Sequence, residues 1–280
     1  MNDEAPAFFI PTPTVGRGAT WLAALTGGAA LRAGHPPSVQ VADAPLAGRT
    51  ARWIAVVPDA ANPFPRARNG EVGLVEGWAL ARAVHEAVDA DRDAAPAAKR
   101  AIVAVVDVSS QAYGRREEAF GIHEALAGAA GAYARARLEG HPVVALLVGK
   151  AMSGAFLAHG YQANRIVALD DPGVMVHAMG KAAAARVTLR SVEDLERLAA
   201  DVPPMAYDLA SYASLGLLWR RIAVGDAERP SPADVARVRE TLEAALADIA
   251  ADPSRGLASR LGGENRQASL RVREKLTAQW

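Results

Sequence analysis

Two short stretches carry the residue types that could do chemistry, and each of them directly follows an apolar run. The first reads "SSQAYG" (109–114) and the second reads "AMSG" (151–154), and a helical pattern follows each one. The start of a helix offers unpaired N–H groups with partial positive charge, and two such groups can form an oxyanion hole for an enolate oxygen. We therefore predict backbone donors in both loops, from Ser110, Gln111, Ala112, Tyr113, Gly114, Met152, Ser153 and Gly154.

Ser153 could instead act as a nucleophile. The nucleophile elbow of hydrolases reads Gly-x-Ser-x-Gly, because the turn is crowded at both glycine positions. Here Ala151 and Ala155 occupy those positions, although His159 and His177 are available to complete a triad. We therefore expect a backbone role for this turn rather than a hydroxyl nucleophile. A tight turn that only packs is the remaining alternative.

Charged residues and histidines near the loops are further candidates. Arg115 and Arg116 stand at the start of a helix, where the dipole disfavours cations, so they are candidates for binding an anionic ligand. His177 follows an apolar run, where a packed histidine is more common than a catalytic one. The six histidines show no spacing typical of a metal site, and we predict none. The chain has no Walker A motif, and "GRGATW" (16–21) lacks the last glycine of a dinucleotide motif.

The composition excludes several classes of protein. The 280 residues are 51% hydrophobic and 22% charged, which is typical of a globular chain with a substantial core. Basic and acidic residues balance at 31 each, which argues against a nucleic-acid partner. Without cysteine there are no disulfides, thiolate zinc sites or cysteine nucleophiles. The N-terminus has no signal-peptide pattern, and no apolar run is long enough to insert into a membrane, so we expect a cytoplasmic protein.

Short apolar runs alternate with helical patterns along the chain. The runs are apolar nearly throughout, which is typical of strands that are buried on both faces. Serines with an acid three residues later, Ser191 and Ser231, are expected helix caps. The expected strands are 52–57, 101–108, 142–148 and 165–169, and the expected helices are 71–88 and 116–140. We predict a single α/β domain over 1–280, with an irregular segment at about 1–48 (one short helix at 21–25) and a helical C-terminal part at about 190–280.

Four stretches resemble the γ subunit of malonate decarboxylase. They are "GEVGLVEGWALA" (70–81), "SQAYGRREEAFG" (110–121), "GKAMSGAFLAHGYQANRIVAL" (149–169) and "MVHAMGK" (175–181). More distantly, the two loop–helix units resemble the carboxyltransferase subunits of acyl-CoA carboxylases, whose first loop reads Asp-x-Pro-Gly and whose second is rich in glycine. Asp107 is kept here, whereas Ser109-Ser110 and the segment 151–155 depart from that pattern. These departures fit a decarboxylase better than a biotin carboxyltransferase.

The resemblance implies a crotonase-like (ClpP/crotonase) spiral of ββα units and an active site shared with a homologous β subunit. The implied substrate is a malonyl thioester on an acyl-carrier subunit, which loses CO₂ to leave the acetyl thioester. No cofactor is expected to be bound covalently to this chain. The carrier's phosphoribosyl-dephospho-CoA arm, or a CoA thioester, would enter the site, and Arg115, Arg116 and Tyr161 are the residues we expect to bind it.

Two questions remain open at this level. One is the residue that protonates the enolate, for which Tyr113, His159, Tyr161 and His177 are candidates. The other is the role of the chain. It could be a stand-alone thioester hydrolase or hydratase of the crotonase superfamily, a carboxyltransferase subunit of a biotin-dependent complex, or a structural subunit whose partner does all the chemistry.

Overall fold

The computed structural model describes residues 16–252, 254 and 256–280. Within them, the strands form one sheet in the order β1-β2-β3-β4-β5-β7, and β6 pairs with β4 off this path. Only β1 and β2 pair in the antiparallel sense, and the other pairs are parallel. The strands are β1 (Val39–Leu46), β2 (Arg49–Val56), β3 (Ala101–Val108), β4 (Val143–Met152), β5 (Arg165–Leu169), β6 (Met175–His177) and β7 (Arg220–Ile222).

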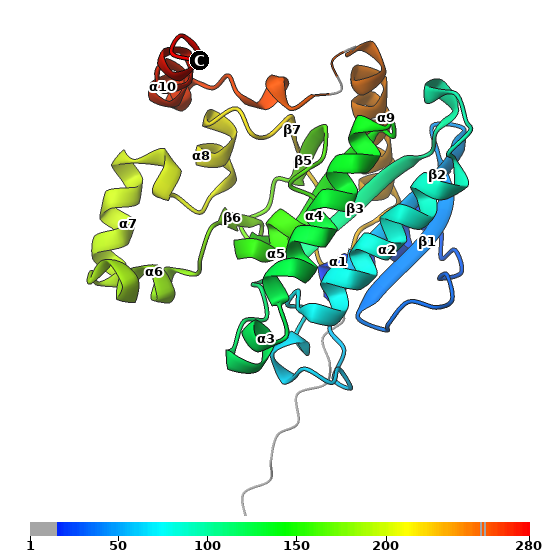
Figure 1. Ribbon diagram of the computed structural model, residues 1–280, viewed down its shortest axis with the longest axis horizontal. Helices are drawn as coiled ribbons and strands as arrows, with labels where there is room; N and C mark the ends of the chain where they lie inside the picture. The colour runs from blue at the N-terminus through cyan, green and yellow to red at the C-terminus, as the bar shows by residue number, and fades with distance from the viewer. Residues whose placement is uncertain (1–15, 253, 255) are drawn as a thin grey trace, which may run out of the picture.

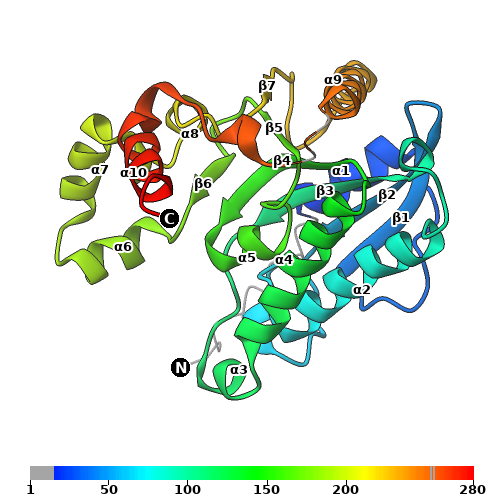
Figure 2. The ribbon, with the colours of Figure 1, turned by 45° about the horizontal axis from the view of Figure 1, so that its top comes forward.

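Helices cover the sheet and extend beyond it. The α-helices are α1 (Arg17–Thr26), α2 (Leu74–Ala90), α3 (Arg115–Ala119), α4 (Ile122–Leu138), α5 (Ser153–Ala158), α6 (Lys181–Thr188), α7 (Val192–Asp201), α8 (Leu209–Ser214), α9 (Pro232–Ala251) and α10 (Gln267–Thr277). α2 and α4 run side by side in front of the sheet, and α9 lies behind it (Figures 1 and 2). The segment from β6 to α8 extends away from the sheet as an arm that carries α6 and α7.

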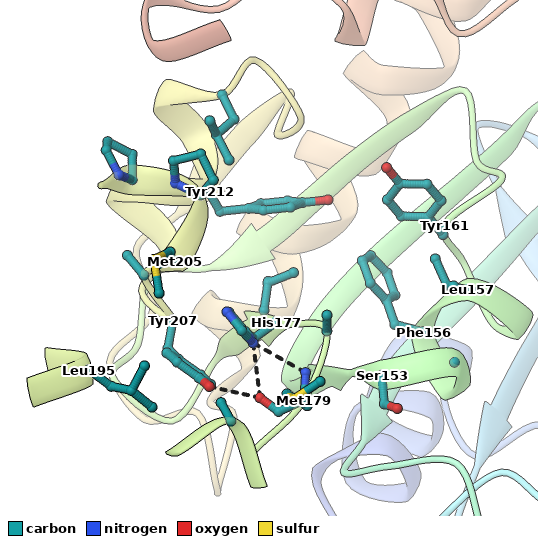
Figure 3. Close-up of a pocket in the computed structure, with 18 of the residues that line it drawn as sticks. Ser153, Phe156, Leu157, Tyr161, His177, Met179, Leu195, Met205, Tyr207 and Tyr212 are labelled. Carbon is teal, nitrogen blue, oxygen red and sulfur yellow. Dashed lines mark hydrogen bonds between the residues drawn. The ribbon is translucent and has the colours of Figure 1, made fainter. Parts of the chain in front are cut away.

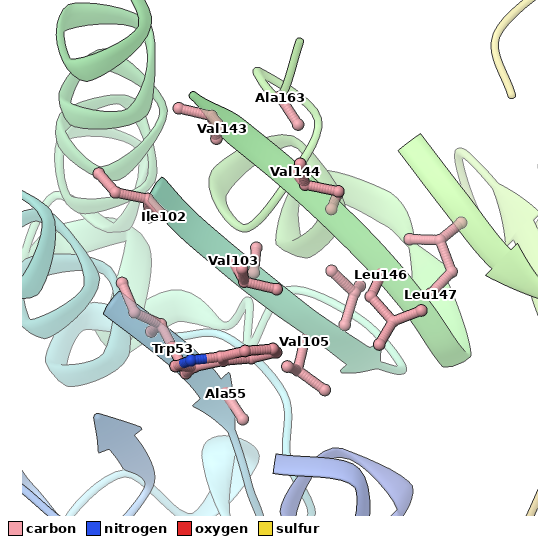
Figure 4. Close-up of a cluster of buried hydrophobic side chains, with 14 of the residues drawn as sticks. Trp53, Ala55, Ile102, Val103, Val105, Val143, Val144, Leu146, Leu147 and Ala163 are labelled. Atoms are coloured by element: carbon pink, nitrogen blue, oxygen red, sulfur yellow. The ribbon is translucent and has the colours of Figure 1, made fainter. Parts of the chain in front are cut away.

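The core lies on both faces of the central strands. Trp53 of β2, Val103 and Val105 of β3, and Leu146 of β4 are all fully buried (Figure 4). β-Branched and other aliphatic side chains suit a pleated strand that is covered on both faces, which is why these strands are apolar without alternation. The α/β prediction is therefore confirmed.

The expected elements match the structure in part. The strands at 101–108 and 165–169 are β3 and β5, and Ser191 and Ser231 both cap helices through their side chains, as expected. The helix expected at 116–140 is instead α3 and α4, because Gly121 adopts a left-handed conformation with φ +79° and separates them. The helical C-terminal part also contains the short strand β7.

The prediction of an irregular segment at about 1–48 is wrong where the structure describes it. α1 is longer than the short helix expected at 21–25, and β1 pairs with β2 along its whole length. Asp43 of β1 accepts hydrogen bonds from Arg52, and α1 buries Trp21. These tertiary contacts stabilise a strand whose sequence, with Asp43 and Pro45, has weak strand propensity. Residues 1–15 lie outside the described part, and the single-domain prediction stays a prediction.

Two general properties of the described part bear on function. None of its helices combines the length and the apolar character that a membrane crossing requires. It also contains no group of three or more histidine, aspartate or glutamate side chains arranged to hold a metal ion.

α2 and α4 approach closely because Gly77 of α2 lies against the backbone of α4. A Cβ at Gly77 would lie 2.8 Å from the carbonyl carbon and oxygen of Ala125 and 2.9 Å from its Cβ. Backbone atoms within a packed helix cannot move aside as the end of a side chain can. Gly131, on the exposed side of α4, has no atom within 4 Å of the corresponding position.

We expect opposite effects from alanine at these two helical glycines. Gly77→Ala should lower the free energy of unfolding by about 1–3 kcal/mol, because the added methyl group overpacks the contact between the helices. Gly131→Ala should raise it by about 0.5–1 kcal/mol, because alanine is the better helix former and meets no clash. Urea unfolding of both variants measures the difference. Stabilisation by both substitutions would contradict the close helix contact.

Candidate active site

The candidate site is built around the junction between β4 and α5. β4 runs to Met152 and α5 begins at Ser153, so the strand end expected after residue 148 is too early. Parallel pairing with β3 on one side, and with β5 and β6 on the other, fixes the direction of β4. The chain enters the helix within one residue, and Ser153 takes φ +60°, a left-handed conformation that is uncommon outside glycine.

This turn has the backbone of a sharp elbow, but alanine stands two residues before and two residues after Ser153, where a nucleophile elbow has glycine. Ala151 and Ala155 are fully buried, so alanine fits both flanking positions. Ser153 lines a cavity together with His177. The imidazole of His177 is bonded through Nδ1 to Met179 rather than to Ser153. The first N–H groups of α5 have no partner within the helix. The junction therefore offers donors, whereas the serine hydroxyl has no base bonded to it among the described residues.

The two predicted loops meet at Gly154. A Cβ on Gly154 would lie 2.0 Å from Oε1 of Gln111, so the Gln111 side chain covers the Cα of Gly154 directly. The next nearest atom is Cδ1 of Leu126, at 3.5 Å. The structure thus brings the segments 109–114 and 151–154 together as the sequence predicts. The absence of a side chain at residue 154 leaves the space that the Gln111 carboxamide occupies.

The backbone of the first loop is partly used for structure. Val72 forms a parallel bridge with Gln111, in which the Ala112 N–H donates to the Val72 carbonyl at 2.8 Å. The Tyr113 N–H donates to the Gln111 carbonyl at 3.0 Å. The prediction that Ala112 and Tyr113 supply backbone donors to a ligand is therefore wrong for this arrangement. The backbone donors still predicted in this loop are those of Ser110, Gln111 and Gly114.

Arg115 and Arg116 do not line the cavity. Both are exposed at the start of α3, and the Arg116 guanidinium lies over the ring of Phe64 at 4.9 Å. A cation–π contact of this kind gives Arg116 a structural partner. Their expected role in binding an anionic arm is thus confined to the surface beside the first loop, and it stays a prediction.

The cavity lies between α5 and the arm and has a volume of about 540 Å³. Ser153, Phe156 and Tyr161 line it from one side, and residues of β6, α8 and the connecting segments line it from the other (Figure 3). Its walls are mostly apolar, with Met179, Leu195 and Met205 among them. A cavity with apolar walls and a few polar groups suits a small organic ligand or the end of a longer one.

His177 is the imidazole of this cavity, and its ring is held in place. Nδ1 lies 2.9 Å from the carbonyl oxygen and 3.2 Å from the N–H of Met179, so either tautomer is bonded there. The ring stacks on Tyr207 at 3.9 Å between centroids, and the Tyr207 hydroxyl donates to the same Met179 carbonyl. Burial lowers the pKa of His177. Because Nδ1 is used, Nε2 is the nitrogen that remains for a ligand.

His159, also a candidate proton source, belongs to the core. It is completely buried, and its Nε2 lies 3.1 Å from the Val105 carbonyl, which can only accept. Nε2 therefore carries the proton, and Nδ1 accepts from the Tyr133 hydroxyl at 3.0 Å. Burial lowers the pKa of His159 to about 4. Both nitrogens are bonded within the core, so His159 is excluded as the proton source. Tyr113, half-exposed on the first loop, does not line the cavity either.

Tyr207 and Tyr212 line the cavity from the arm and were not predicted from the sequence. One signal was available, because the chain has only five tyrosines and these two lie close together in an alanine-rich segment. Their meeting with Tyr161 depends on the tertiary arrangement of β6 and α8, which no local pattern specifies.

Comparisons with known proteins agree on one family. Residues 67–280 match the family model of the malonate decarboxylase gamma subunit. A crystal structure of a Pseudomonas malonate decarboxylase hetero-tetramer in complex with coenzyme A contains a similar chain. It is 68% identical, over 95% of this chain and 100% of that one, with a TM-score of 0.91. A chain of the Pseudomonas MdcD–MdcE hetero-dimer is 65% identical, over 95% and 99% of the two chains, with a TM-score of 0.87.

More distant relatives are carboxyltransferases. The malonyl-S-ACP:biotin-protein carboxyltransferase MADD of Malonomonas rubra is 37% identical over 154 residues, which span 55% of this chain and only 53% of that relative. The 12S subunit of transcarboxylase is 20% identical over 88% of this chain and 43% of that one, with a TM-score of 0.62. This last likeness concerns the fold alone, and it confirms the crotonase-like fold.

The buried His159 predicts a specific pH dependence of stability. Only the unfolded chain takes up a proton between the ordinary histidine pKa of 6.5 and about 4. The contribution of neutral His159 to the free energy of unfolding is therefore complete above pH 6.5. It is lost as the pH falls toward 4, and its full size is on the order of 3 kcal/mol. His159→Gln keeps a donor for Val105 but cannot titrate, so its free energy of unfolding should fall less over this range. Exposed His123→Gln should behave as the wild type in urea unfolding at each pH. If the free energy of unfolding changed with pH in the same way for the wild type and His159→Gln, His159 would not be a buried neutral imidazole.

Proposed function

The chain belongs to the malonate decarboxylase gamma subunit family, and from that premise we propose that it forms one half of a decarboxylase active site shared with a homologous β subunit. The substrate is a malonyl thioester and the products are the acetyl thioester and CO₂. The observation that carries the proposal is the β4–α5 junction, where Ser153 has a left-handed backbone and both Ser153 and Gly154 line a cavity of about 540 Å³. Relatives that assemble with MdcD, and one that acts on malonyl-S-ACP, support it.

The chemistry needs stabilisation of an enolate oxygen. Loss of CO₂ breaks a C–C bond and leaves its electron pair delocalised onto the thioester oxygen. Donors that are already oriented toward that oxygen lower the barrier, and removal of one such donor typically costs on the order of 10²–10³ in rate. We assign this role to the N–H groups of Ser153 and Gly154. The side chain of Ser153 is not needed for it.

The Gln111 side chain is the contribution that we assign to the first loop. The Gln111 side chain lies against the Cα of Gly154. The β-bridge to Val72 holds the Gln111 backbone in place. A carboxamide at this point can orient the thioester against the N–H groups of the turn. In this proposal the loop acts through one side chain more than through its backbone.

We assign proton delivery to His177, directly or through one water. It lines the same cavity as Ser153, and Met179 fixes its ring so that Nε2 is the nitrogen left for a ligand. Tyr161 also lines the cavity and is the alternative donor. The thioester would arrive on the CoA-like arm of an acyl-carrier subunit, with Arg115 and Arg116 near its path. A cytoplasmic location stays a prediction from the sequence.

A stand-alone thioester hydrolase is the second candidate, and one observation favours it. The left-handed Ser153 between a strand and a helix reproduces the strained backbone of a nucleophile elbow. The two candidates differ in the need for a β subunit and in the role of the Ser153 hydroxyl.

We expect CO₂ release from malonyl-CoA only when the chain is co-expressed with its β subunit. In this complex Ser153→Ala should retain most of the rate, because alanine keeps a Cβ at the same backbone position and removes only the hydroxyl. Gly154→Val should lower the rate by about 10²–10³ without unfolding the chain, because the side chain displaces Gln111 and blocks the turn. Turnover by the chain alone, together with an inactive Ser153→Ala variant, would favour the hydrolase.

Gly154 and Gln111 should behave as one unit. Gly154→Ala alone should lower the rate at least about tenfold, because its methyl group takes the place of Oε1 of Gln111. Gln111→Gly should cost a similar factor, and the double variant should cost little more than either single variant. Decarboxylation rates of the wild-type complex, both single variants and the double variant complete this double-mutant cycle. If the two losses multiply, Gly154 acts independently of Gln111.

A further inference from the structure

The end of β4 contains a bulge opposite Asp107 of β3. The two strands pair regularly as far as Leu147 of β4, and the next pair joins Val108 to Ala151. Only Asp107 therefore stands opposite the segment 148–150 of β4. A bulge leaves backbone groups without a partner in the ladder and changes the direction of its strand, and bulges are common beside active sites. This one comes directly before the turn into α5.

Two charged side chains hold the backbone of this bulge. Oδ1 of Asp107 accepts from the Lys150 N–H at 3.0 Å. On the other side of the bulge, Arg17 of α1 donates to the Val148 carbonyl at 3.2 Å, and Asp171 fixes the same guanidinium at 2.7 Å. Hydrogen bonds with one ionised partner are roughly twice as strong as neutral ones. The bulge is thus fixed by side chains from β3 and α1.

Gly149 leaves the space in which the Asp107 carboxylate lies. A Cβ on Gly149 would lie 2.1 Å from Oδ1 and 2.5 Å from Cγ of Asp107. Gly149 is not one of the described glycines with positive φ, so its backbone is open to any residue type. Glycine is therefore needed here for the close approach of the carboxylate and not for its conformational freedom.

The segment from Lys150 to Met152 connects the bulge to two parts of the site. All three of its residues pair with β6, and the last pair joins Met152 to His177. Ser153 follows Met152 directly and begins α5. A displacement of Lys150 should therefore move both the turn and the backbone that carries the His177 imidazole.

We propose that Asp107 is a positioning residue of this site, because by holding the bulge it fixes the backbone of Ser153 and Gly154. This inference rests on the proposed function, in which the N–H groups of these two residues stabilise the enolate oxygen. Asp107 is not among the described residues that line the cavity. It therefore acts through the Lys150 N–H and not on the substrate.

A positioning role has a kinetic signature. The donors act on charge that develops as CO₂ leaves, so their displacement should lower kcat and leave KM nearly unchanged. A misplacement of about 1 Å can cost on the order of 10² in rate. A residue that only supports the fold would lower the free energy of unfolding without this selective loss of kcat.

The first test measures CO₂ release from malonyl-CoA by the complex with the β subunit. Asp107→Ala removes the acceptor and should lower kcat by about 10–100-fold, with KM within about twofold of the wild type. Asp107→Asn keeps an acceptor oxygen for the Lys150 N–H and should hold kcat within about fivefold of the wild type. The matched control is Asp170→Ala, which removes another carboxylate at the end of a strand. Asp170 pairs with the exposed Arg221, and its loss should leave kcat and KM within about twofold.

The second test is hydrogen exchange, which does not depend on turnover. In the Asp107→Ala complex the amides of residues 150–152 should exchange at least about tenfold faster, whereas those of β5 should keep their rates. Gly149→Ala should reproduce the lower kcat and the faster exchange, because its methyl group displaces the same carboxylate. This variant also carries the test if Asp107→Ala does not fold.

The outcomes separate this inference from the proposed function. A kcat for Asp107→Ala within about twofold of the wild type, or a rise in KM alone, would overturn the inference. An Asp107→Asn variant as slow as Asp107→Ala would also overturn it, because the charge would then matter and not the bond to Lys150. Unchanged exchange of residues 150–152 in Asp107→Ala would do so whatever the rate. Absence of CO₂ release by the wild-type complex would instead count against the proposed function.

Discussion

The constraint on which the site depends is the parallel pairing of β4 with strands on both of its sides. β3 and β5 fix its first half, and β6 pairs with Lys150, Ala151 and Met152 at its end. With the strand held up to its last residue, the chain can reach α5 only through an abrupt change at Ser153. The Asp107 carboxylate adds a cross-link, because it accepts from the Lys150 N–H at 3.0 Å. The arm starts at β6. The strand that pairs with the end of β4 therefore also positions residues of the opposite wall of the cavity.

The first loop depends on a different buried group, Glu76 of α2. This carboxylate is fully buried and accepts from Ser38 Oγ and Asn62 Nδ2, both at 2.6 Å, and from the Gly73 N–H at 3.0 Å. A buried carboxylate requires such donors, and here they tie the start of α2 to two loops. Val72, next to Gly73, then bridges to Gln111. The backbone of the first loop is therefore used to hold the loop in place, and its side chains are what it can offer a ligand.

The central strands and the helix caps were predictable because their signals are local: continuous β-branched runs and serines with an acid three residues later. β1 was not predictable, since it depends on its ion pair with Arg52 and on cover by α1. The end of β4 was misjudged for a related reason, because Gly149-Lys150 has the local character of a turn whereas the distant β6 extends the strand. In the site, Ser153, Gly154 and His177 were predicted from their position after an apolar run, whereas Tyr161 was named only as a candidate proton donor and arm-binding residue after the family resemblance. Tyr212 could not be predicted, since nothing near it in the sequence places α8 opposite α5.

Two unfavourable features lie around one cavity, and folding alone explains neither. Ser153 keeps a left-handed backbone that glycine would adopt at lower cost, typically of order 1–3 kcal/mol for such positions. On the other side of the cavity the Tyr212 hydroxyl is unbonded, and Arg260, which lies against the Tyr161 ring, is buried without a carboxylate among the described residues. Elsewhere the buried charges Glu76 and Arg52 are bonded by protein groups. The Ser153 turn and the Tyr212 hydroxyl line the same cavity, so a bound ligand is what can satisfy groups that the protein leaves without partners.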